Sequence, residues 1–119
     1  DTLGHDIGDI VLIAFANAAR KTLRENDKFG RYGGEEWLFI LHTTNKSVVD
    51  NIFKRLNENF ANYCIDIKSG HPALDWDITF SVGASITSKA NNNLDFHIKK
   101  ADELLYQAKA DGRNKVVIG

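Results

Sequence analysis

The sequence predicts an α+β fold in which helices pack on a mostly antiparallel sheet. Three observations support this class. Apolar residues recur with helical spacing in three long segments, they alternate with polar residues in shorter ones, and two short apolar runs are separated only by glycines and acids. The segments follow the order helix, hairpin, helix, strand, helix, strand. With 119 residues and no repeat or linker, residues 1–119 are expected to form one domain.

The three helices are predicted from their apolar stripes. The first covers about residues 8–26, the second covers 47–62 with Ser47 as its N-cap, and the third covers 94–110 and ends before Gly112. Their buried faces are predicted to consist of Leu12, Phe15, Ala16, Ala19 and Leu23 in the first, Val49, Ile52, Phe53, Leu56 and Phe60 in the second, and Leu94, Ile98, Ala101, Leu105 and Ala108 in the third.

The strands are predicted from shorter patterns. Residues 28–32 and 37–41 form a hairpin, residues 76–86 alternate between apolar and polar or small side chains, and residues 115–118 form a closing strand. Residues 63–75, which contain the only proline, are expected to form a loop or a short irregular hairpin. Because the chain opens on turn residues and passes directly into a helix, a first strand is expected to be missing upstream.

Composition excludes several classes of function. A net charge of -1 argues against a general nucleic-acid binder. No apolar run approaches the ~20 residues of a membrane span, and no signal-peptide pattern is visible. The only cysteine, Cys64, allows no intrachain disulfide, which fits a cytoplasmic location. The four histidines lack zinc-type spacing, so a metal would be held by carboxylates, which favours Mg²⁺.

The turn formed by Gly33, Gly34, Glu35 and Glu36 is the most informative segment. Glycines adopt backbone angles closed to other residues and let a ligand approach the main chain closely. Two adjacent carboxylates could hold a divalent cation beside a triphosphate bound over the glycines. The alternative is a hairpin tip carrying acids that only favour solubility.

Other charged residues also have two interpretations. Asp9 is either the N-cap of the first helix or an acceptor for the N1 and N2 donors of guanine. Lys109 and Arg113, at the end of the third helix, either complement the helix dipole or pair with phosphate oxygens. Arg24 and Asp27 form an Arg-x-x-Asp pair, which by default is a solvated ion pair.

Four segments, in the same order, resemble signatures of the GGDEF family of diguanylate cyclases, and together they span nearly the whole chain. Residues 1–9 read DTLGHDIGD and resemble N-D-x-x-G-H-x-x-G-D without its first Asn. Residues 31–37 read RYGGEEW and resemble R-[YF]-G-G-[DE]-E-F. Residues 79–84 read TFSVGA and resemble T-x-S-x-G-[VI]. Residues 101–114 read ADELLYQAKADGRN and resemble A-D-x-A-x-Y-x-A-K-x-x-G-R-N.

The resemblance implies a palm-like sheet, similar to those of polymerases and nucleotidyl cyclases, and the condensation of two GTP molecules into cyclic di-GMP by a homodimer. GTP would lie over Gly33 and Gly34. Its guanine would contact Asp9, and its phosphates would contact Lys109 and Arg113. The resemblance further implies that Glu35 and Glu36 hold Mg²⁺, and that Glu35 also helps to activate the attacking 3′-hydroxyl.

Two departures from the family pattern matter. Trp37 replaces Phe at the fifth motif position, and this change of size on a buried strand is expected to be tolerated. The family's first strand, with its metal-binding Asp and a guanine-contacting Asn just before Asp1, is absent. The 119 residues alone are therefore expected to be catalytically inactive and prone to self-association through an unpaired strand edge. A sensory domain is expected upstream.

The resemblance also implies product inhibition. Many cyclases of the family carry an Arg-x-x-Asp at this distance before the glycine turn, where it binds cyclic di-GMP. Here that pair is Arg24 and Asp27, and Arg55 corresponds to an arginine that closes the site in some members. The competing interpretations are a non-catalytic receptor for cyclic di-GMP, a GTP-sensing regulatory module, or a purely structural dimerisation domain.

Overall fold

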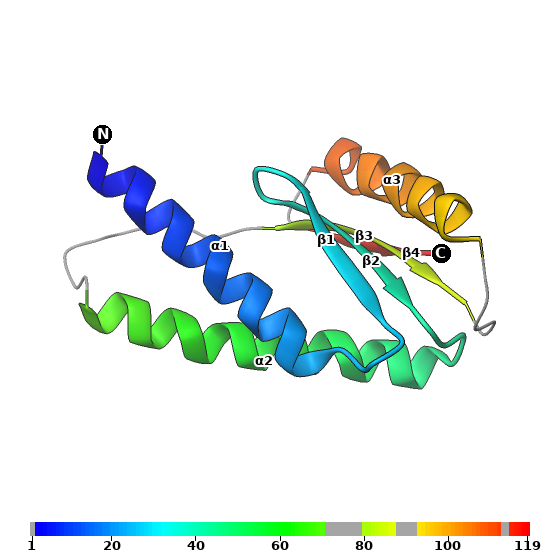
Figure 1. The fold of residues 1–119 in the computed structure, drawn as a ribbon, viewed down its shortest axis with the longest axis horizontal. Helices are drawn as coiled ribbons and strands as arrows, with labels where there is room; N and C mark the ends of the chain where they lie inside the picture. Colours follow the sequence, from blue (N-terminus) through cyan, green and yellow to red (C-terminus); the bar gives the residue numbers. More distant parts are fainter. Residues whose placement is uncertain (1, 71–79, 88–92, 113–114) are drawn as a thin grey trace. The chain divides into compact units, whose positions relative to one another are not determined.

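The computed structural model describes residues 2–70, 80–87, 93–112 and 115–119, and the side chains from residue 8 onward. The chain divides into two compact units: residues 1–23 with 50–77, and residues 24–49 with 78–119. The elements are α1 (Thr2–Thr22), β1 (Lys28–Gly33), β2 (Glu36–Leu41), α2 (Lys46–Gly70), β3 (Ser81–Ile86), α3 (Leu94–Ala110) and β4 (Val116–Ile118) (Figure 1). None of the helices, over the part of the chain that is described, is both long and apolar enough for a membrane span.

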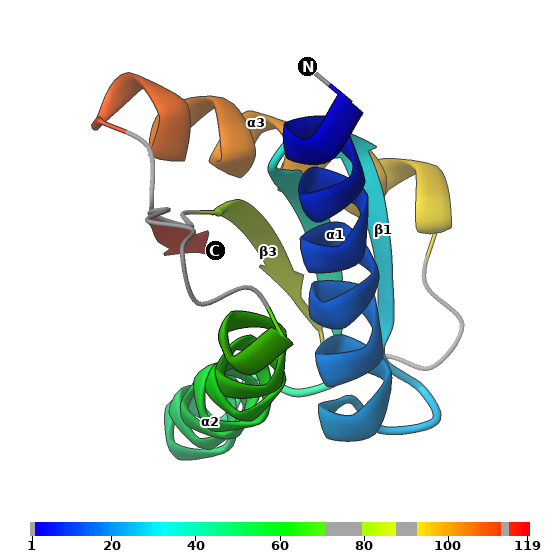
Figure 2. The same ribbon diagram turned by 90° about the vertical axis from the view of Figure 1, so that its left-hand side faces the viewer.

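The first unit contains α1 and most of α2, which contact each other near the end of α1 (Figure 2). The ring of Phe15 meets that of Phe60 edge to face, with centroids 5.5 Å apart. The amide of Asn59 donates to the hydroxyl of Thr22 over 2.8 Å, and that hydroxyl donates to the carbonyl of Ala18 over 2.7 Å. The most buried positions of α1 follow helical spacing and are Val11, Ala14, Phe15, Ala18, Ala19 and Thr22.

Both ends of α1 differ from the prediction. The helix begins at Thr2 instead of residue 8, so Asp9 lies inside it and the N-cap interpretation of Asp9 is wrong. The helix ends at Thr22, four residues early, because the Asp27 carboxylate accepts a hydrogen bond from the backbone N–H of Arg24 and holds the next residues in a turn.

The second helix, α2, is longer than predicted. It continues through residues 63–70, where a loop or hairpin was expected, so that part of the prediction is wrong; residues 71–75 lie outside the described residues. Its last turns bury little, and Ile65 is 65% exposed, so no apolar stripe marks them. The N-cap is Asn45, whose side-chain oxygen accepts from the N–H groups of Ser47 and Val48. Ser47 is therefore inside the helix.

The second unit contains a four-stranded sheet in the order β1-β2-β3-β4, and this sheet is mixed. Strands β1 and β2 pair antiparallel, whereas β2 with β3 and β3 with β4 pair parallel. The expectation of a mostly antiparallel sheet is wrong. A helix separates β2 from β3 and another separates β3 from β4 in the chain, and such crossover connections return a strand in the same direction. Residues 76–79 of the predicted strand lie outside the described residues.

Helix α3 packs against one face of this sheet and has the predicted bounds (Figure 1). The helix approaches the sheet closely at Gly83 of β3, where an added Cβ would overlap the carbonyl oxygen of Ala101 and the amide nitrogen of Leu105. On the same face, the hydroxyl of Ser85 and Nδ1 of His97 lie 2.8 Å apart, and both residues are buried. The opposite face of β2 carries three buried side chains, which are Trp37, Phe39 and Leu41.

Candidate functional site

The predicted glycine turn joins β1 to β2. Gly33 pairs with Glu36, so Gly34 and Glu35 form a two-residue turn. Gly34 has φ of +50°, a region that favours glycine. A Cβ at either glycine would meet nothing within 4 Å, so close packing does not explain the glycines, and the space above them is open to a ligand. The side chain of Arg31 fixes the turn by donating to the carbonyl of Gly34 over 3.1 Å.

Sequence reasoning missed a second feature of this turn. The strand register shifts between Arg31 and Gly33, which leaves Tyr32 as an extra residue in β1. The hydroxyl of Tyr32 donates a hydrogen bond to the carboxylate of Asp102 on α3; this bond, with the negative charge of Asp102, raises the pKa of Tyr32. The contact ties the glycine turn to α3. Asp102 belongs to the segment 101–114 that resembles the family signature, which was the available signal.

The structure brings Glu36 and Lys109 together, although 73 positions separate them in the chain. The Lys109 ammonium lies 3.4 Å from both carboxylate oxygens of Glu36, and both side chains remain partly exposed. A cation and a carboxylate thus meet beside the open glycines. A cavity of about 380 Å³ adjoins them, lined by Tyr32, Asp102, Glu103, Leu105, Tyr106 and Lys109.

Glu35 and Glu36 are the two carboxylates of the glycine turn. Glu35 is exposed, and its carbonyl accepts the N–H of Ser81, which fixes the backbone beside Glu36. Carboxylate oxygens suit a hard cation such as Mg²⁺. Among the described residues, however, no three acidic, histidine or cysteine side chains gather closely enough to form a metal cluster. These two carboxylates could act as ligands of a divalent cation only if substrate phosphates or further ligands completed the set.

The Arg24–Asp27 pair is built into the turn that follows α1. The Asp27 carboxylate, whose side chain is 0% exposed, accepts from the Arg24 guanidinium at 2.9 and 3.1 Å and from the backbone N–H of His42 at 2.8 Å. The interpretation as a solvated ion pair is wrong for Asp27. Burial by itself raises the pKa of Asp27, but the hydrogen bonds from Arg24 and His42 together hold it below its ordinary value. The Arg24 side chain remains 46% exposed.

This lowered pKa predicts acid-sensitive stability. Because the folded-state pKa of Asp27 lies below the unfolded value, its contribution is present above about pH 4 and is lost as the pH falls through the folded pKa. We expect Asp27→Asn to lower the free energy of unfolding by ~2 kcal/mol at pH 7 and to flatten its decline below about pH 4. Urea unfolding from pH 7 to 3 measures both effects. The exposed Asp50→Asn is the control, and equal pH profiles for Asp27→Asn and the parent would contradict the prediction.

The remaining predicted site residues are divided between the two units or lie outside the described residues. Asp9 is exposed on α1 and Arg55 is exposed on α2, both in the first unit, whereas the glycine turn and Lys109 are in the second. Arg113 lies outside the described residues. Trp37 is buried as expected, with its ring centroid 6.1 Å from that of Phe29.

Comparison with known proteins identifies the family. The model of the family described as "Diguanylate cyclase, GGDEF domain" matches residues 1–115. The chain is 38% identical over 117 residues to the response regulator PleD of Caulobacter vibrioides, covering 98% of this chain and 25% of that protein. It is 34% identical over 118 residues to the probable diguanylate cyclase DgcT of Escherichia coli, covering 99% and 26%. It is 30% identical over 118 residues to diguanylate cyclase A of Treponema denticola, covering 99% and 31%.

The chain therefore spans between a quarter and a third of the length of these relatives. The match nevertheless extends over nearly all of the chain, and it includes the glycine turn and the segment that carries Lys109. On this evidence, the chain belongs to the GGDEF domain family of diguanylate cyclases.

Proposed function

We propose that the protein carrying this chain is a diguanylate cyclase that condenses two GTP molecules into cyclic di-GMP in the cytoplasm. One observation carries the proposal. The Lys109 ammonium and the Glu36 carboxylate lie 3.4 Å apart beside a glycine turn with open space above it. Such a site supplies what phosphoryl transfer requires, namely close backbone approach to phosphates and charges of both signs.

In the proposed reaction, two domains face each other and each holds one GTP. The 3′-oxygen of each GTP attacks the α-phosphorus of the other, and Glu35 takes part in removing the hydroxyl proton. A new P–O bond forms, the bond from the α-phosphorus to the bridging oxygen breaks, and pyrophosphate leaves. Two such steps give cyclic di-GMP and two pyrophosphates. Lys109 and Arg113 would pair with the phosphate oxygens and stabilise the developing charge.

A divalent cation, which we propose to be Mg²⁺ held by Glu35 and Glu36, would when bound neutralise phosphate charge. We further propose that residues N-terminal to this chain supply another strand with an additional carboxylate ligand, and that a sensory domain precedes it. The test is incubation of the longer protein with α-labelled GTP and separation of the products. Cyclic di-GMP with pyrophosphate supports the proposal. GTP or cyclic di-GMP binding without turnover would identify a regulatory or receptor module instead.

Asp9 is proposed to select guanine. Its carboxylate can accept from the N1 and N2 donors of guanine, and adenine presents no matching pair, so a site built for these bonds rejects ATP. We expect Asp9→Ala to weaken GTP binding at least tenfold and to narrow the preference over ATP, as measured by calorimetry with each nucleotide. The control is Asp66→Ala, since Asp66 is an exposed carboxylate on α2. Unchanged GTP affinity in Asp9→Ala would leave Asp9 without this role.

Arg24 is proposed to bind cyclic di-GMP at a separate inhibitory site. Since the Asp27 carboxylate is enclosed, its proposed part is to hold the exposed Arg24 guanidinium in place for a guanine edge or a phosphate. Arg55 is proposed to close the site from a neighbouring subunit. Product binding would then shift the population of assemblies away from the productive one.

Calorimetric titration of cyclic di-GMP tests this site. Arg24→Ala is expected to weaken product binding at least tenfold, and Arg55→Ala is expected to weaken it by less. The exposed Arg20, whose guanidinium donates to the side-chain oxygen of Asn17 over 2.8 Å, provides the control Arg20→Ala. If Arg24→Ala binds the product as tightly as the parent does, the inhibitory-site proposal fails.

A further inference from the structure

Strand β1 forms one edge of the sheet, because it pairs with β2 alone. Lys28, Gly30, Arg31 and Tyr32 of this strand are exposed. Within the described ranges, no backbone hydrogen bond reaches β1 from outside its hairpin with β2. An edge strand with free N–H and C=O groups can pair with an added strand. The outer edge of β1 therefore offers backbone N–H and C=O groups to which an added strand could bind.

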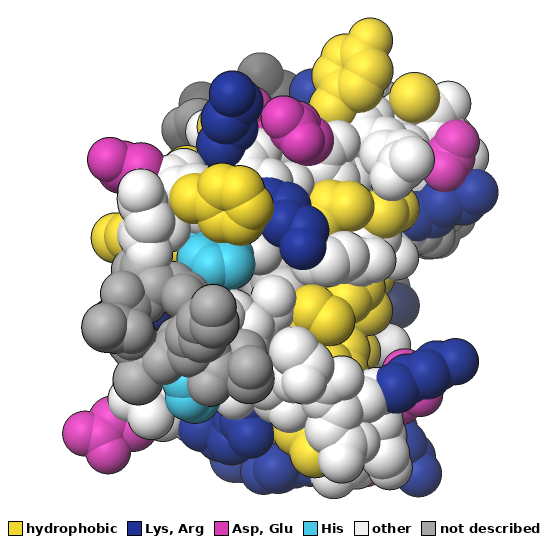
Figure 3. Space-filling model, turned by 90° about the vertical axis from the view of Figure 1, so that its right-hand side faces the viewer, with side chains coloured by type: hydrophobic (Ala, Val, Ile, Leu, Met, Phe, Trp, Pro, Cys, Tyr) yellow, Lys and Arg dark blue, Asp and Glu magenta, His cyan; other side chains and the backbone are white. Residues whose placement is uncertain are grey.

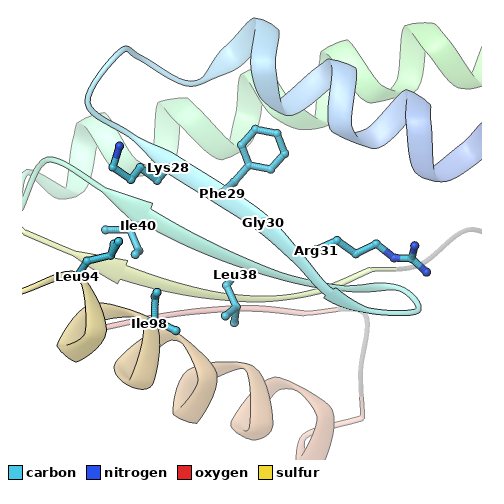
Figure 4. A pocket seen from close by; sticks show the side chains of 8 residues that line it. All are labelled: Lys28, Phe29, Gly30, Arg31, Leu38, Ile40, Leu94 and Ile98. Carbon is cyan, nitrogen blue, oxygen red and sulfur yellow. The ribbon is translucent and has the colours of Figure 1, made fainter.

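A hollow beside this edge could hold a side chain of the added strand. Gly30 lies opposite Leu38, which faces α3, and a Cβ at Gly30 would meet nothing within 4 Å. The missing side chain leaves a groove of about 260 Å³ between the sheet and α3. Leu38 and Ile40 form its floor, and the exposed Leu94 and Ile98 form its wall. In Figure 4 these four side chains point toward one another, whereas Phe29 points to the opposite face of the sheet.

The exposure of the wall was not expected, since Leu94 and Ile98 were predicted to belong to the buried stripe of α3. They are 47% and 41% exposed. Figure 3, which shows the side of the molecule where α3 begins, displays hydrophobic side chains reaching the surface there. Exposed apolar side chains next to an open strand edge are typical of a binding surface.

The positive charge of β1 indicates which kind of segment the groove could bind. Lys28 lies at the end of the groove near Ile40 and Leu94, where α3 also presents its N-terminus, and Arg31 is the other charged residue of β1. The strand has no carboxylate. A second copy pairing through β1 would bring these like charges close together, which disfavours self-association at this edge. An acidic side chain on the groove face of an added strand is complementary to Lys28, whereas Arg31 alternates to the other face of β1 and donates to the carbonyl of Gly34.

We propose that β1 is the docking site for an extended peptide segment of a partner protein, which adds to the sheet as a further edge strand. The segment inserts an apolar side chain over Gly30 and places an acidic side chain beside Lys28. Side chains on one face of a strand are two residues apart, as Gly30 and Lys28 are, so the segment carries its apolar and acidic residues separated by one position. In this mode of recognition the backbone supplies affinity and the groove supplies specificity. The inference does not depend on cyclase activity.

The probe is a fluorescein-labelled polythreonine heptapeptide with leucine at its third position and glutamate at its fifth. Fluorescence anisotropy measures its binding to the full chain, and amide hydrogen exchange by NMR reports whether the N–H groups of β1 become protected. Gly30→Val is expected to fill the hollow and weaken binding at least tenfold. Lys28→Glu is expected to weaken binding at least fivefold, and a peptide with lysine in place of glutamate should restore it. Lys99→Glu, an exposed cation on α3 outside the groove lining, is the control.

Circular dichroism and thermal melts establish that each variant is folded; if Gly30→Val is not, Ile98→Ser replaces it as the variant that alters the groove. The proposal is supported if the groove variants weaken peptide binding as expected and if the bound peptide protects the N–H groups of β1 from exchange. It is overturned by absence of binding at millimolar peptide, by equal binding to a peptide with serine in place of leucine, or by loss of binding in Lys99→Glu. If octanoate occupies the groove without protecting the N–H groups of β1, the groove binds a small apolar ligand instead. If Gly30→Val abolishes self-association of the chain, the occupant is a second copy of the chain. Either result overturns the proposal.

Discussion

In the longer protein, replacement of Glu36 by Gln is expected to abolish cyclic di-GMP synthesis without unfolding the domain. The substitution keeps the shape of the side chain and removes the charge that lies 3.4 Å from Lys109. A carboxylate that holds a divalent cation and balances a phosphate-binding lysine contributes several kcal/mol to the transition state, so activity should fall at least ~100-fold. The partly exposed Glu36–Lys109 pair is worth only ~0–1 kcal/mol of stability.

The measurement is the initial rate of pyrophosphate release from GTP, with urea unfolding in parallel. Glu35→Gln is expected to give the same loss of activity, because it removes the second of the two carboxylates that we propose as ligands of the divalent cation. Glu58→Gln, an exposed carboxylate on α2, should retain parental activity and stability. Near-normal turnover in Glu36→Gln or Glu35→Gln would remove that residue from the active site.

The second large effect is expected at Gly83. A Cβ at this position would overlap the carbonyl of Ala101 and the backbone nitrogen of Leu105, and it would lie 2.9 Å from Cα of Leu105. These atoms belong to the backbone of α3, which can give way only if the whole helix moves from the sheet. Overpacking of a core costs typically 1–3 kcal/mol, and we expect Gly83→Ala to cost ~3 kcal/mol or more.

Urea unfolding followed by circular dichroism measures this effect as a lower midpoint with an unchanged slope. The matched control is Gly30→Ala. Gly30 also lies in a strand, but its added Cβ meets nothing within 4 Å, so its stability should change by no more than ~1 kcal/mol in either direction. A loss below 1 kcal/mol in Gly83→Ala would mean that α3 does not approach β3 as closely as described.

The parts of the fold that the sequence predicted are those with a strong local signal. The bounds of α3 follow from its apolar period, and the β1–β2 hairpin follows from two apolar runs around a glycine turn. The predicted ends of α1 and α2 were wrong because the apolar pattern does not record every feature that ends or extends a helix. An exposed helical turn leaves no apolar stripe, as at Ile65, and a carboxylate such as Asp27 can end a helix before its pattern does.

By itself, the sequence determined the family, the glycine turn and its two acids, because these depend on residue identity and spacing. Only the tertiary structure decided what depends on contacts between distant segments. It showed that β2, β3 and β4 run parallel and that Lys109 lies beside Glu36. It also showed that Leu94 and Ile98 stay exposed and line one groove with Gly30. A one-dimensional pattern records which residues are apolar or charged, and the partner that each one meets is fixed only when the chain folds.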